Sequence, residues 1–275
     1  MPRAGTIVRY AVLLLALLIC GYPLVWMLFT AVRQEGAILA NPFGLPLTPT
    51  LESMRLVLQT GGFLRAYANS LLVCTAAVAA STLGAAAAAF ALARLPLRGR
   101  GAFLLLFVIG MMIPIHVTLV PLNRMLGAGG LGWKQSLWVL LGPYVGFSLP
   151  ISLLILRNAF LRLPDELFEA ARMDGCGHWR LFLSIALPLV RPALATVVIF
   201  NALTLWNEFA FALTLIADQQ DRTLPLALWQ FQGEHGMFLA QTCAALCVAV
   251  VPLLLVYTFA QDHIIRGLTA GATKG

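Results

Sequence analysis

Hydrophobic residues run through this chain in long uncharged stretches that alternate with short charged ones. The first such stretch covers residues 10–32, and five more of similar character follow it. A helix needs about 20 mostly apolar residues to cross a bilayer, and a bilayer satisfies backbone groups only inside helices or closed barrels. The pattern therefore predicts six spanning helices, over residues 10–32, 66–93, 101–123, 135–156, 192–217 and 238–261, with a charged loop over 157–191.

The composition supports the same interpretation. The chain is 60% hydrophobic and only 11% charged, and its mean hydropathy is +0.89. Soluble domains have an apolar share nearer one half. The net charge of +7 does not indicate nucleic acid as a partner, because the basic residues are dispersed and form no binding arm. We therefore expect an all-α membrane protein, surrounded by lipid, that forms one transmembrane domain over residues 1–275.

The first stretch has an alternative interpretation as a cleaved signal peptide, because Arg3 and Arg9 precede it. Its uncharged segment is longer than the 7–15 apolar residues that are usual for the core of a signal peptide. We therefore expect a retained helix.

The orientation follows from the positions of Lys and Arg. If the N-terminus is cytoplasmic, 12 of the 18 Lys and Arg residues fall on the cytoplasmic side and 6 on the other side. Positive residues favour the cytoplasmic side of membrane proteins. We therefore predict that both termini and the charged loop 157–191 are cytoplasmic. On the external side, the loop over residues 33–65 is predicted to contain a helix that begins near Thr50, with Thr50 or Thr48 as its cap.

The charged loop contains the signals of a short helix. Pro164 suits a first helical turn, and Asp165 and Glu166 complement a helix N-terminus. Gly175 directly follows the turn-prone Asp174, where a residue with left-handed backbone geometry would end the helix. A second short helix, "HWRLFLSIALP", then leads toward the fifth span and meets Pro188.

This predicted helix is amphipathic. Helical spacing places Leu163, Leu167, Ala170 and Ala171 together, and it places Glu166, Glu169 and Arg172 on another side. The small alanine side chains would let the backbone of another protein approach closely, and the flanking charges would set its register. The alternative is an ordinary cytoplasmic loop whose acidic side chains are only solvated. The pattern alone leaves both interpretations open.

The same segment resembles the EAA loop of ATP-binding-cassette (ABC) importer permeases. That motif reads EAA, three residues, G, nine residues, I, one residue, L and P, and the chain keeps every spacing. In the family this loop forms a coupling helix that sits in a cleft of a cytoplasmic ATPase subunit. The resemblance assigns ATPase coupling to Glu169, Ala170, Ala171, Asp174, Gly175, Ile185, Leu187 and Pro188.

Three further stretches resemble the second (G-type) permease subunit of carbohydrate importers of the maltose type. They are "LTLWNEFAFALTLI" at 203–216, "RTLPLAL" at 222–228 and "GLTAGATKG" at 267–275. The resemblance covers essentially the whole chain. It implies the type I ABC importer permease fold, with six transmembrane helices, in a bacterial inner membrane. It also implies import of a sugar or a related polyol.

The resemblance also implies the partners. They are a sister permease subunit that completes a heterodimer, two cytoplasmic ATPase subunits that bind ATP with Mg²⁺, and an external solute-binding protein. The chain itself would be no enzyme and would hold no catalytic residue and no cofactor. It contains no GxxxxGK[ST] phosphate-binding motif. We expect no metal site, because no His or acidic residue near Cys243 and Cys247 completes a ligand set.

Polar residues inside the predicted spans are candidates for the translocation pathway or a gate. Glu208 is the strongest, because an acid inside a membrane indicates function by default. The alternative is a structural anchor, and the sequence leaves both roles open. His116 follows Pro114 closely and could instead satisfy a carbonyl freed by a proline bend in the third span. The full set of candidates is Asn201, Trp206, Asn207, Glu208 and His116.

The C-terminal tail is glycine-rich, and glycine weakens helices. We therefore expect the tail to be too flexible for a stable helix. In the resembling subunits the tail reaches the ATPase dimer. The resemblance assigns this contact to Gly267, Thr269, Gly271 and Lys274.

Two other functions stay open at this point. An importer permease of this kind could carry another small solute, such as glycerol phosphate or an amino acid. A self-contained secondary carrier would be expected to show inverted repeats with broken helices at matching positions. The sequence shows no such symmetry, which favours the importer.

Overall fold

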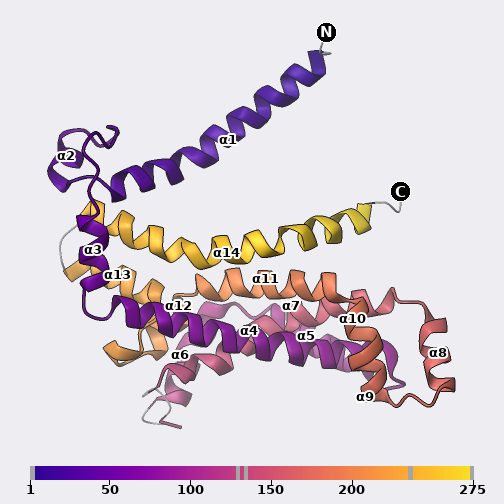
Figure 1. Ribbon diagram of the computed structural model, residues 1–275. Coiled ribbons are helices and arrows are strands. Elements are labelled where there is room, and N and C mark those ends of the chain that lie inside the picture. Colours follow the sequence, from indigo (N-terminus) through magenta and orange to yellow (C-terminus); the bar gives the residue numbers. More distant parts are fainter. Residues whose placement is uncertain (1–3, 128–130, 133–135, 235–237, 273–275) are drawn as a thin grey trace. The chain divides into compact units, whose positions relative to one another are not determined.

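The computed structural model describes residues 4–127, 131–132, 136–234 and 238–272 of the chain. Within these residues all regular structure is helical and no strand occurs (Figure 1). In the part of the chain that the structure describes, four helices are long and apolar enough to cross a membrane. The number rises to six if each of two sharply bent helix pairs is counted as one span. The predicted all-helical membrane fold is confirmed.

The chain divides into two compact units. Unit 1 consists of residues 1–65 and 227–251, and unit 2 consists of residues 66–226 and 252–275. The helices, several of which continue from one unit into the other, are in order α1 (Ala4–Ala31), α2 (Glu35–Ala40), α3 (Glu52–Gln59), α4 (Phe63–Arg94), α5 (Arg100–Met111), α6 (Ile115–Leu126), the 3-10 turn η2 (Leu137–Leu140), α7 (Leu141–Leu161), α8 (Asp165–Met173), α9 (His178–Arg180), the π-helical turn η3 (Leu181–Ala186), α10 (Leu187–Leu189), α11 (Arg191–Trp206), α12 (Ala210–Leu215), the 3-10 turn η4 (Gln219–Asp221), α13 (Leu224–Glu234) and α14 (Leu239–Ala272).

In unit 1, two charged residues organise the segment after α1. Arg33 is only 5% exposed, and its Nη2 donates hydrogen bonds to the carbonyls of Ala37 and Asn41 at 2.7 and 2.8 Å. The carboxylate of Glu35 accepts the backbone N–H groups of Leu239 and Ala240 at 2.8 and 3.0 Å. These are donors at the start of α14 that have no partner inside the helix. Both side chains therefore satisfy backbone groups at helix ends.

The third predicted span is bent at its proline, as the sequence indicates. α5 ends at Met111, α6 begins after Pro114, and the two helices meet at 95°. Proline lacks a backbone N–H and disfavours helical geometry in the residue before it. The consequence is a break rather than a gentle curve.

The fifth predicted span is not one helix over residues 192–217. α11 ends at Trp206, and the short α12 begins only at Ala210. Polar side chains at the break bond to the backbone: Nδ2 of Asn207 donates to the carbonyl of Leu203 at 2.8 Å. Such local bonds compete with helical ones. The helix is therefore interrupted where "WNEF" occurs.

The expectation of a flexible tail is wrong for residues 267–272, because α14 continues to Ala272. Each glycine costs a helix about 1 kcal/mol relative to alanine. The difficult step of helix formation is nucleation, whereas extension adds a hydrogen bond for each residue fixed. Here residues 267–272 are the last part of α14, which is 34 residues long in all, so they only extend a helix that is already formed. Lys274 lies outside the described residues.

The core of unit 2 lies between α4, α7, the charged loop and α11. Ala85, Ala86 and Ala89 of α4 are fully buried, and small residues of this kind let membrane helices approach closely. Phe90 stands at the centre of an aromatic group. Its ring lies 5.7 Å from that of Phe160, 6.4 Å from that of Phe168 and 5.2 Å from that of Phe182. One core therefore joins two long helices to the charged loop.

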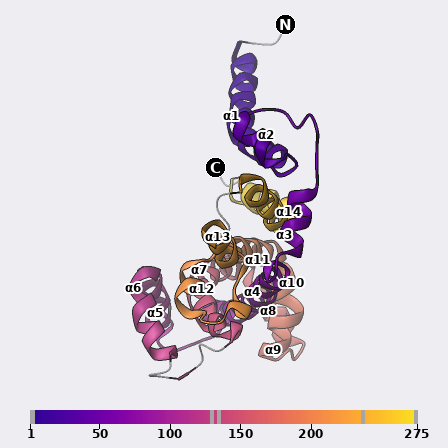
Figure 2. The ribbon, with the colours of Figure 1, turned by 90° about the vertical axis from the view of Figure 1, so that its left-hand side faces the viewer.

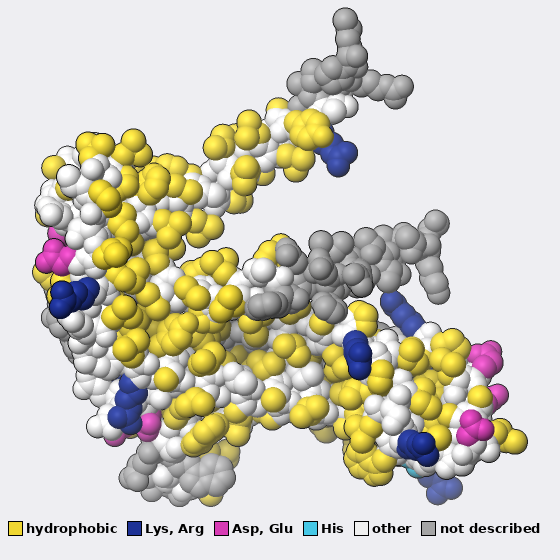
Figure 3. Space-filling model, viewed as in Figure 1, with side chains coloured by type: hydrophobic (Ala, Val, Ile, Leu, Met, Phe, Trp, Pro, Cys, Tyr) yellow, Lys and Arg dark blue, Asp and Glu magenta, His cyan; other side chains and the backbone are white. Residues whose placement is uncertain are grey.

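The outward faces of the long helices are apolar. α5 has no buried residue, and residues such as Leu105 and Leu106 are more than half exposed. Figure 3 shows hydrophobic side chains over most of the visible surface, whereas acidic side chains gather over α8. Figure 2 shows α5 and α6 at one side of unit 2. Such a surface suits lipid or another membrane subunit rather than water.

Candidate functional site

The predicted short helix in the charged loop is α8, and its ends are formed as the sequence indicates. Pro164 has extended geometry at the N-cap, and Asp165 and Glu166 occupy the first turn. Gly175 has a φ of +76°. The N–H of Cys176 donates to the carbonyl of Ala171 at 2.9 Å, and the N–H of Gly175 donates to that of Arg172 at 3.0 Å. This pair of bonds around a left-handed glycine is a Schellman motif, which fixes where the chain leaves the helix.

The buried face of α8 differs from the predicted one. Phe168 and Ala171 are 3% and 7% exposed and belong to the core of unit 2, whereas Leu167 is 43% exposed and Ala170 is also exposed. The prediction that Leu167 and Ala170 lie on the same face as Ala171 is therefore wrong. Phe168 offers the largest apolar area in the helix, so turning it inward buries more surface. As a result Ala170 faces outward and Ala171 packs inside.

The side of α8 away from Phe168 and Ala171 is exposed within the described part of the chain. It is formed by the exposed side chains Glu166, Leu167, Glu169, Ala170 and Met173, which we call the α8 outer face. Met173 is 88% exposed. An apolar group so open, beside two carboxylates and a small alanine, is typical of a surface that another protein covers. One face of α8 is thus fixed to the core while the opposite face is free to bind.

The second half of the motif lies in the arm that returns from α8 to α11. α9, η3 and α10 follow one another without a gap, and the arm meets α11 at 78°. Ile185 and Leu187 are half-buried and pack against the core of unit 2. Pro188 is also half-buried and lies in α10. These residues hold the loop against the bundle, whereas Glu169 and Ala170 belong to its outer face. Asp174 is the C-cap residue of α8 and is exposed.

Sequence reasoning missed Arg94, the last residue of α4. Its guanidinium donates to the carbonyl of Phe160 at the end of α7, and it also contacts the carbonyl of Leu163 and the carboxylate of Asp165. Its Cζ lies 4.6 Å from the ring centroid of Phe168. The position of this arginine at the end of a predicted span was visible in the sequence. Its partners were not, because they lie more than 60 residues away along the chain.

The Glu208 carboxylate is hydrogen-bonded to α7 and to the start of α12. The Tyr144 hydroxyl donates to its Oε2 at 2.9 Å. The backbone N–H groups of Phe211 and Ala212 donate to its carboxylate at 2.7 and 3.3 Å. A carboxylate at this place satisfies free donors of the first turn of α12 and complements its dipole. These contacts favour the structural anchor over the gate.

Asn201 joins three long helices inside unit 2. It is 1% exposed, and its Nδ2 donates to the hydroxyls of Ser81 on α4 and Ser152 on α7 at 3.3 and 2.9 Å. Both serines donate their own protons to backbone carbonyls of their helices. The Oδ1 of Asn201 has no hydrogen-bond partner within the described residues. Polar groups between membrane helices of this kind hold them in register.

The other pathway candidates have different surroundings from Asn201. Trp206 is 6% exposed, and its ring meets that of Tyr67 edge to face at 5.7 Å. Asn207 is exposed and bonds to its own helix. His116 is exposed near the start of α6, and its side chain makes no hydrogen bond within the described residues. Gly267, Thr269 and Gly271, the tail candidates, lie in the last turns of α14.

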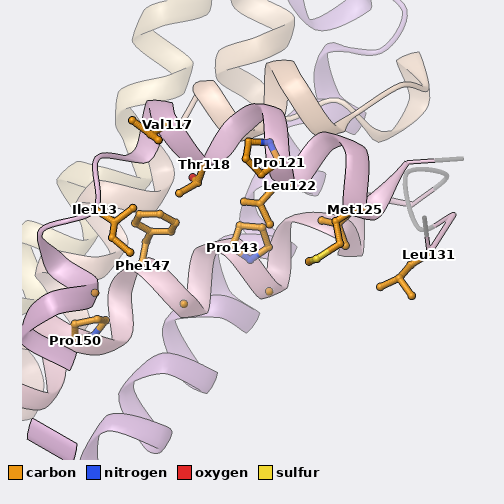
Figure 4. Close-up of a pocket in the computed structure, with 14 residues that line it drawn as sticks. Ile113, Val117, Thr118, Pro121, Leu122, Met125, Leu131, Pro143, Phe147 and Pro150 are labelled. Atoms are coloured by element: carbon orange, nitrogen blue, oxygen red, sulfur yellow. The ribbon is translucent and has the colours of Figure 1, made fainter. Parts of the chain in front are cut away.

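A cleft with a volume of about 730 Å³ lies between α6 and α7 (Figure 4). Val117, Pro121 and Leu122 form one wall, and Pro143 and Phe147 form the other. Its one hydroxyl, on Thr118, donates to the carbonyl of Ile115 at 2.6 Å. A polar solute needs hydrogen-bonding groups aimed at it. The cleft therefore suits an apolar occupant and is not a site for a polar solute.

Comparison with known proteins gives concordant results. A diacetylchitobiose uptake system permease protein of Streptomyces coelicolor is 34% identical over 92% of this chain and 92% of its own length. The trehalose/maltose transport system permease protein MalG of Thermococcus litoralis is 33% identical over 95% of this chain and 94% of its own length. In fold, the chain is similar to a subunit of a bacterial ABC transporter involved in alginate import. The TM-score is 0.83 at 22% identity, over 95% of this chain and 97% of that one.

The family assignment rests on a match to a family model. Residues 80–270, which include the charged loop, α11 and most of α14, match the family described as the inner membrane component of binding-protein-dependent transport systems. This confirms the resemblance that the spacing around Glu169 and Gly175 indicated. The chain belongs to the family of inner membrane permease components of binding-protein-dependent transport systems.

Proposed function

We propose that this chain is one of two permease subunits of an ABC importer that carries a sugar or a related polyol inward across a bacterial inner membrane. The two relatives named above take diacetylchitobiose, and trehalose or maltose, according to their names. Their similarity extends over more than nine-tenths of this chain. The sugar class is supported by these relatives and by the maltose-type stretches of the sequence.

One structural observation carries the proposal. α8 is capped at both ends, its Phe168 and Ala171 are held in the core, and its outer face is open. A helix built in this way can pass a displacement from a bound partner to the bundle. A loop that is merely solvated would need neither the Schellman motif nor the aromatic anchor. We infer that the α8 outer face docks into a cytoplasmic ATPase subunit.

The mechanism that follows is alternating access driven from outside the membrane. Closure of two ATPase subunits around ATP and Mg²⁺ moves α8, and the bundle joined to α8 moves with it. Energy enters at one site and is used at another, through rigid elements that have two arrangements. In this proposal the chain itself hydrolyses nothing and binds no cofactor.

The remaining partners face other surfaces. A sister permease subunit completes the pathway, and an external binding protein delivers the solute. Within the described residues, no residue in the most apolar part of α1 is buried. Such a helix needs lipid or the sister subunit around it, because its side chains are apolar and its backbone groups are already hydrogen-bonded within the helix.

The tail is proposed to contact the ATPase dimer through Gly267, Thr269, Gly271 and Lys274. Because α14 reaches Ala272, the contact would be made by a helix end rather than a flexible strand of chain. Removing residues 267–275 should lower the ATP hydrolysis that is coupled to transport. Full coupled activity after truncation would remove the tail from the docking surface.

The proposed orientation places both termini and α8 in the cytoplasm. Reporter fusions after Gly101 and Gly267 should read cytoplasmic, and a fusion after Gly129 should read external. A cytoplasmic signal at Gly129 would contradict the six-span topology.

Transport itself tests the proposal. The chain is co-expressed with its sister permease, the ATPase and the binding protein, and the purified complex is placed in lipid vesicles. The binding protein is first screened by thermal shift against sugars, polyols, glycerol phosphate and amino acids. We expect a sugar or polyol to stabilise it and to accumulate in vesicles only with ATP. Stabilisation and uptake of an amino acid or of glycerol phosphate alone would replace the proposed substrate class. ATP-independent uptake by this chain alone would indicate a self-contained carrier.

A further inference from the structure

The guanidinium of Arg94 lies at the meeting point of three helices. Its Nε and Nη2 donate to the carbonyl of Phe160 at 2.9 and 2.6 Å. Nη2 also contacts the carbonyl of Leu163, and Nη1 pairs with Oδ1 of Asp165. The side chain is 9% exposed, although it carries a full charge. One residue at the end of α4 thus holds the end of α7, the linker after it and the first turn of α8.

These contacts need an arginine rather than any cation. The carbonyl of Phe160, near the end of α7, accepts the N–H of Leu163 at 3.2 Å, and Arg94 adds donors to the same oxygen. A guanidinium carries five N–H donors in a rigid plane, so it can serve two carbonyls and a carboxylate together. The same plane stacks on an aromatic ring, and Cζ of Arg94 lies 4.6 Å from the centroid of Phe168. A lysine could supply the charge but not this combination of contacts.

The ion pair is the weakest part of the arrangement. The Asp165 side chain is 80% exposed, and exposed ion pairs contribute little in water. The bonds to the carbonyls of Phe160 and Leu163 and the contact with Phe168 lie on the shielded side of Arg94. A purely electrostatic role would therefore depend on Asp165. A role in fixing geometry would depend on the carbonyls and the ring.

The position of these contacts determines what they can do. Beneath α8, the rings of Phe168, Phe90 and Phe160 pack together, which resists separation but sets no direction. Arg94 bonds to the carbonyl of Phe160, near the end of α7, and contacts the carbonyl of Leu163, in the turn that leads into α8. A displacement of α8 would otherwise be absorbed by rotation in this turn. With Arg94 in place, the turn cannot open without breaking several hydrogen bonds at once.

We propose that Arg94 is a positioning residue that makes α8 move as one body with the ends of α4 and α7, so that a displacement of the docking helix reaches the spanning helices. The inference rests on the proposed docking of α8 to an ATPase. It adds that the efficiency of coupling, rather than docking itself, depends on Arg94.

The test uses the complete importer in lipid vesicles and measures three quantities. They are the amount of ATPase that co-purifies, the rate of ATP hydrolysis and the solute taken up per ATP hydrolysed. The variants are Arg94→Lys, which keeps the charge, and Arg94→Gln, which removes it. Arg98→Gln is the matched control, because Arg98 is exposed and follows four residues later. Asp165→Asn separates the exposed ion pair from the shielded contacts.

We expect both Arg94 variants to insert and to keep the ATPase bound. Uptake per ATP should fall by between about twofold and about thirtyfold, the range found when residues that couple two sites are changed. Arg98→Gln should match the unmodified complex, and Asp165→Asn should lose less than either Arg94 variant. Failure of the unmodified complex to retain an ATPase would count against the proposed function and not against Arg94 specifically.

Three results would overturn the inference. Normal uptake per ATP in Arg94→Gln would show that α8 needs no such link. An equal loss in Asp165→Asn would assign the effect to the exposed ion pair. Failure of both Arg94 variants to insert would assign the residue to folding instead of positioning.

Discussion

The hydroxyl of Tyr144 on α7 donates a hydrogen bond of 2.9 Å to Oε2 of Glu208, the acid between α11 and α12. The same carboxylate accepts two backbone N–H groups from the first turn of α12. All these donors belong to this chain, so the acid joins α12 to α7. An acid in a membrane protein is expensive unless it is bonded in this way.

Replacing Glu208 by glutamine should weaken this junction and alter transport while the complex still assembles. The glutamine keeps one acceptor oxygen and turns an NH₂ donor toward groups that are themselves donors. A hydrogen bond to a charged group contributes about 1.5–3 kcal/mol, and a neutral one about 1 kcal/mol. Glu208→Gln should therefore lower the unfolding temperature of the purified complex more than Tyr144→Phe does. The measurements are thermal unfolding in detergent and the rate of uptake in vesicles. If Glu208→Gln changed neither the unfolding temperature nor the rate of uptake, Glu208 would be neither a structural anchor nor part of the transport pathway.

The polar contact among α4, α7 and α11 predicts a smaller effect. Asn201→Ala removes both bonds from Nδ2, to Ser81 and Ser152. Interhelical hydrogen bonds in membranes average about 0.6 kcal/mol each. We expect a loss of roughly 1 kcal/mol in the free energy of unfolding. Thr204→Ala on the same helix is the control, because Thr204 is exposed and bonds only to the carbonyl of Phe200. Equal free energies of unfolding in the two variants would show that Asn201 does not link the helices.

Two glycines near the end of α8 allow the effect of backbone strain to be measured apart from the effect of an added side chain. Gly175 has a φ of +76° and Gly177 a φ of −72°, and an added Cβ would meet no atom within 4 Å at either place. Gly175→Ala should cost about 1 kcal/mol through its left-handed backbone, whereas Gly177→Ala should carry no left-handed strain. A strain of this size does not unfold the chain, but it shifts the end of the docking helix. Gly175→Ala and Gly175→Asp should both reduce co-purification of the ATPase, and Gly177→Ala should not. Equal ATPase binding in the two alanine variants would contradict this account.

The parts of the fold that the sequence predicts are those set by local patterns. Uncharged stretches mark the long helices, Pro114 marks the break between α5 and α6, and Gly175 marks the end of α8. Near the predicted start at Thr50, α3 begins at Glu52, whose N–H donates to the Thr50 hydroxyl at 3.2 Å. In each case the information lies within a few residues.

The parts that the sequence does not predict depend on contacts between distant residues. Helical spacing alone allows either Leu167 or Phe168 to face the core, and the rings of Phe90 and Phe182 decide for Phe168. In the sequence, Arg94 is one of several basic residues at the ends of spans. Its partners on α7 and α8 become visible only in the folded structure. The helical tail depends in the same way on the length of the helix before it.

The α8 outer face is the centre of this account, and Glu169 is its most direct probe. Glu169 is exposed and takes no part in the described core, so Glu169→Lys reverses a charge on the surface without disturbing the fold. Glu52→Lys, on the exposed side of α3, makes the same change away from the charged loop. The measurement is the amount of ATPase subunit that co-purifies with each variant from membranes, at equal amounts of inserted permease. We expect the bound ATPase and ATP-driven uptake to be lost in Glu169→Lys and retained in Glu52→Lys. Retention of both in Glu169→Lys would show that α8 is not the coupling element.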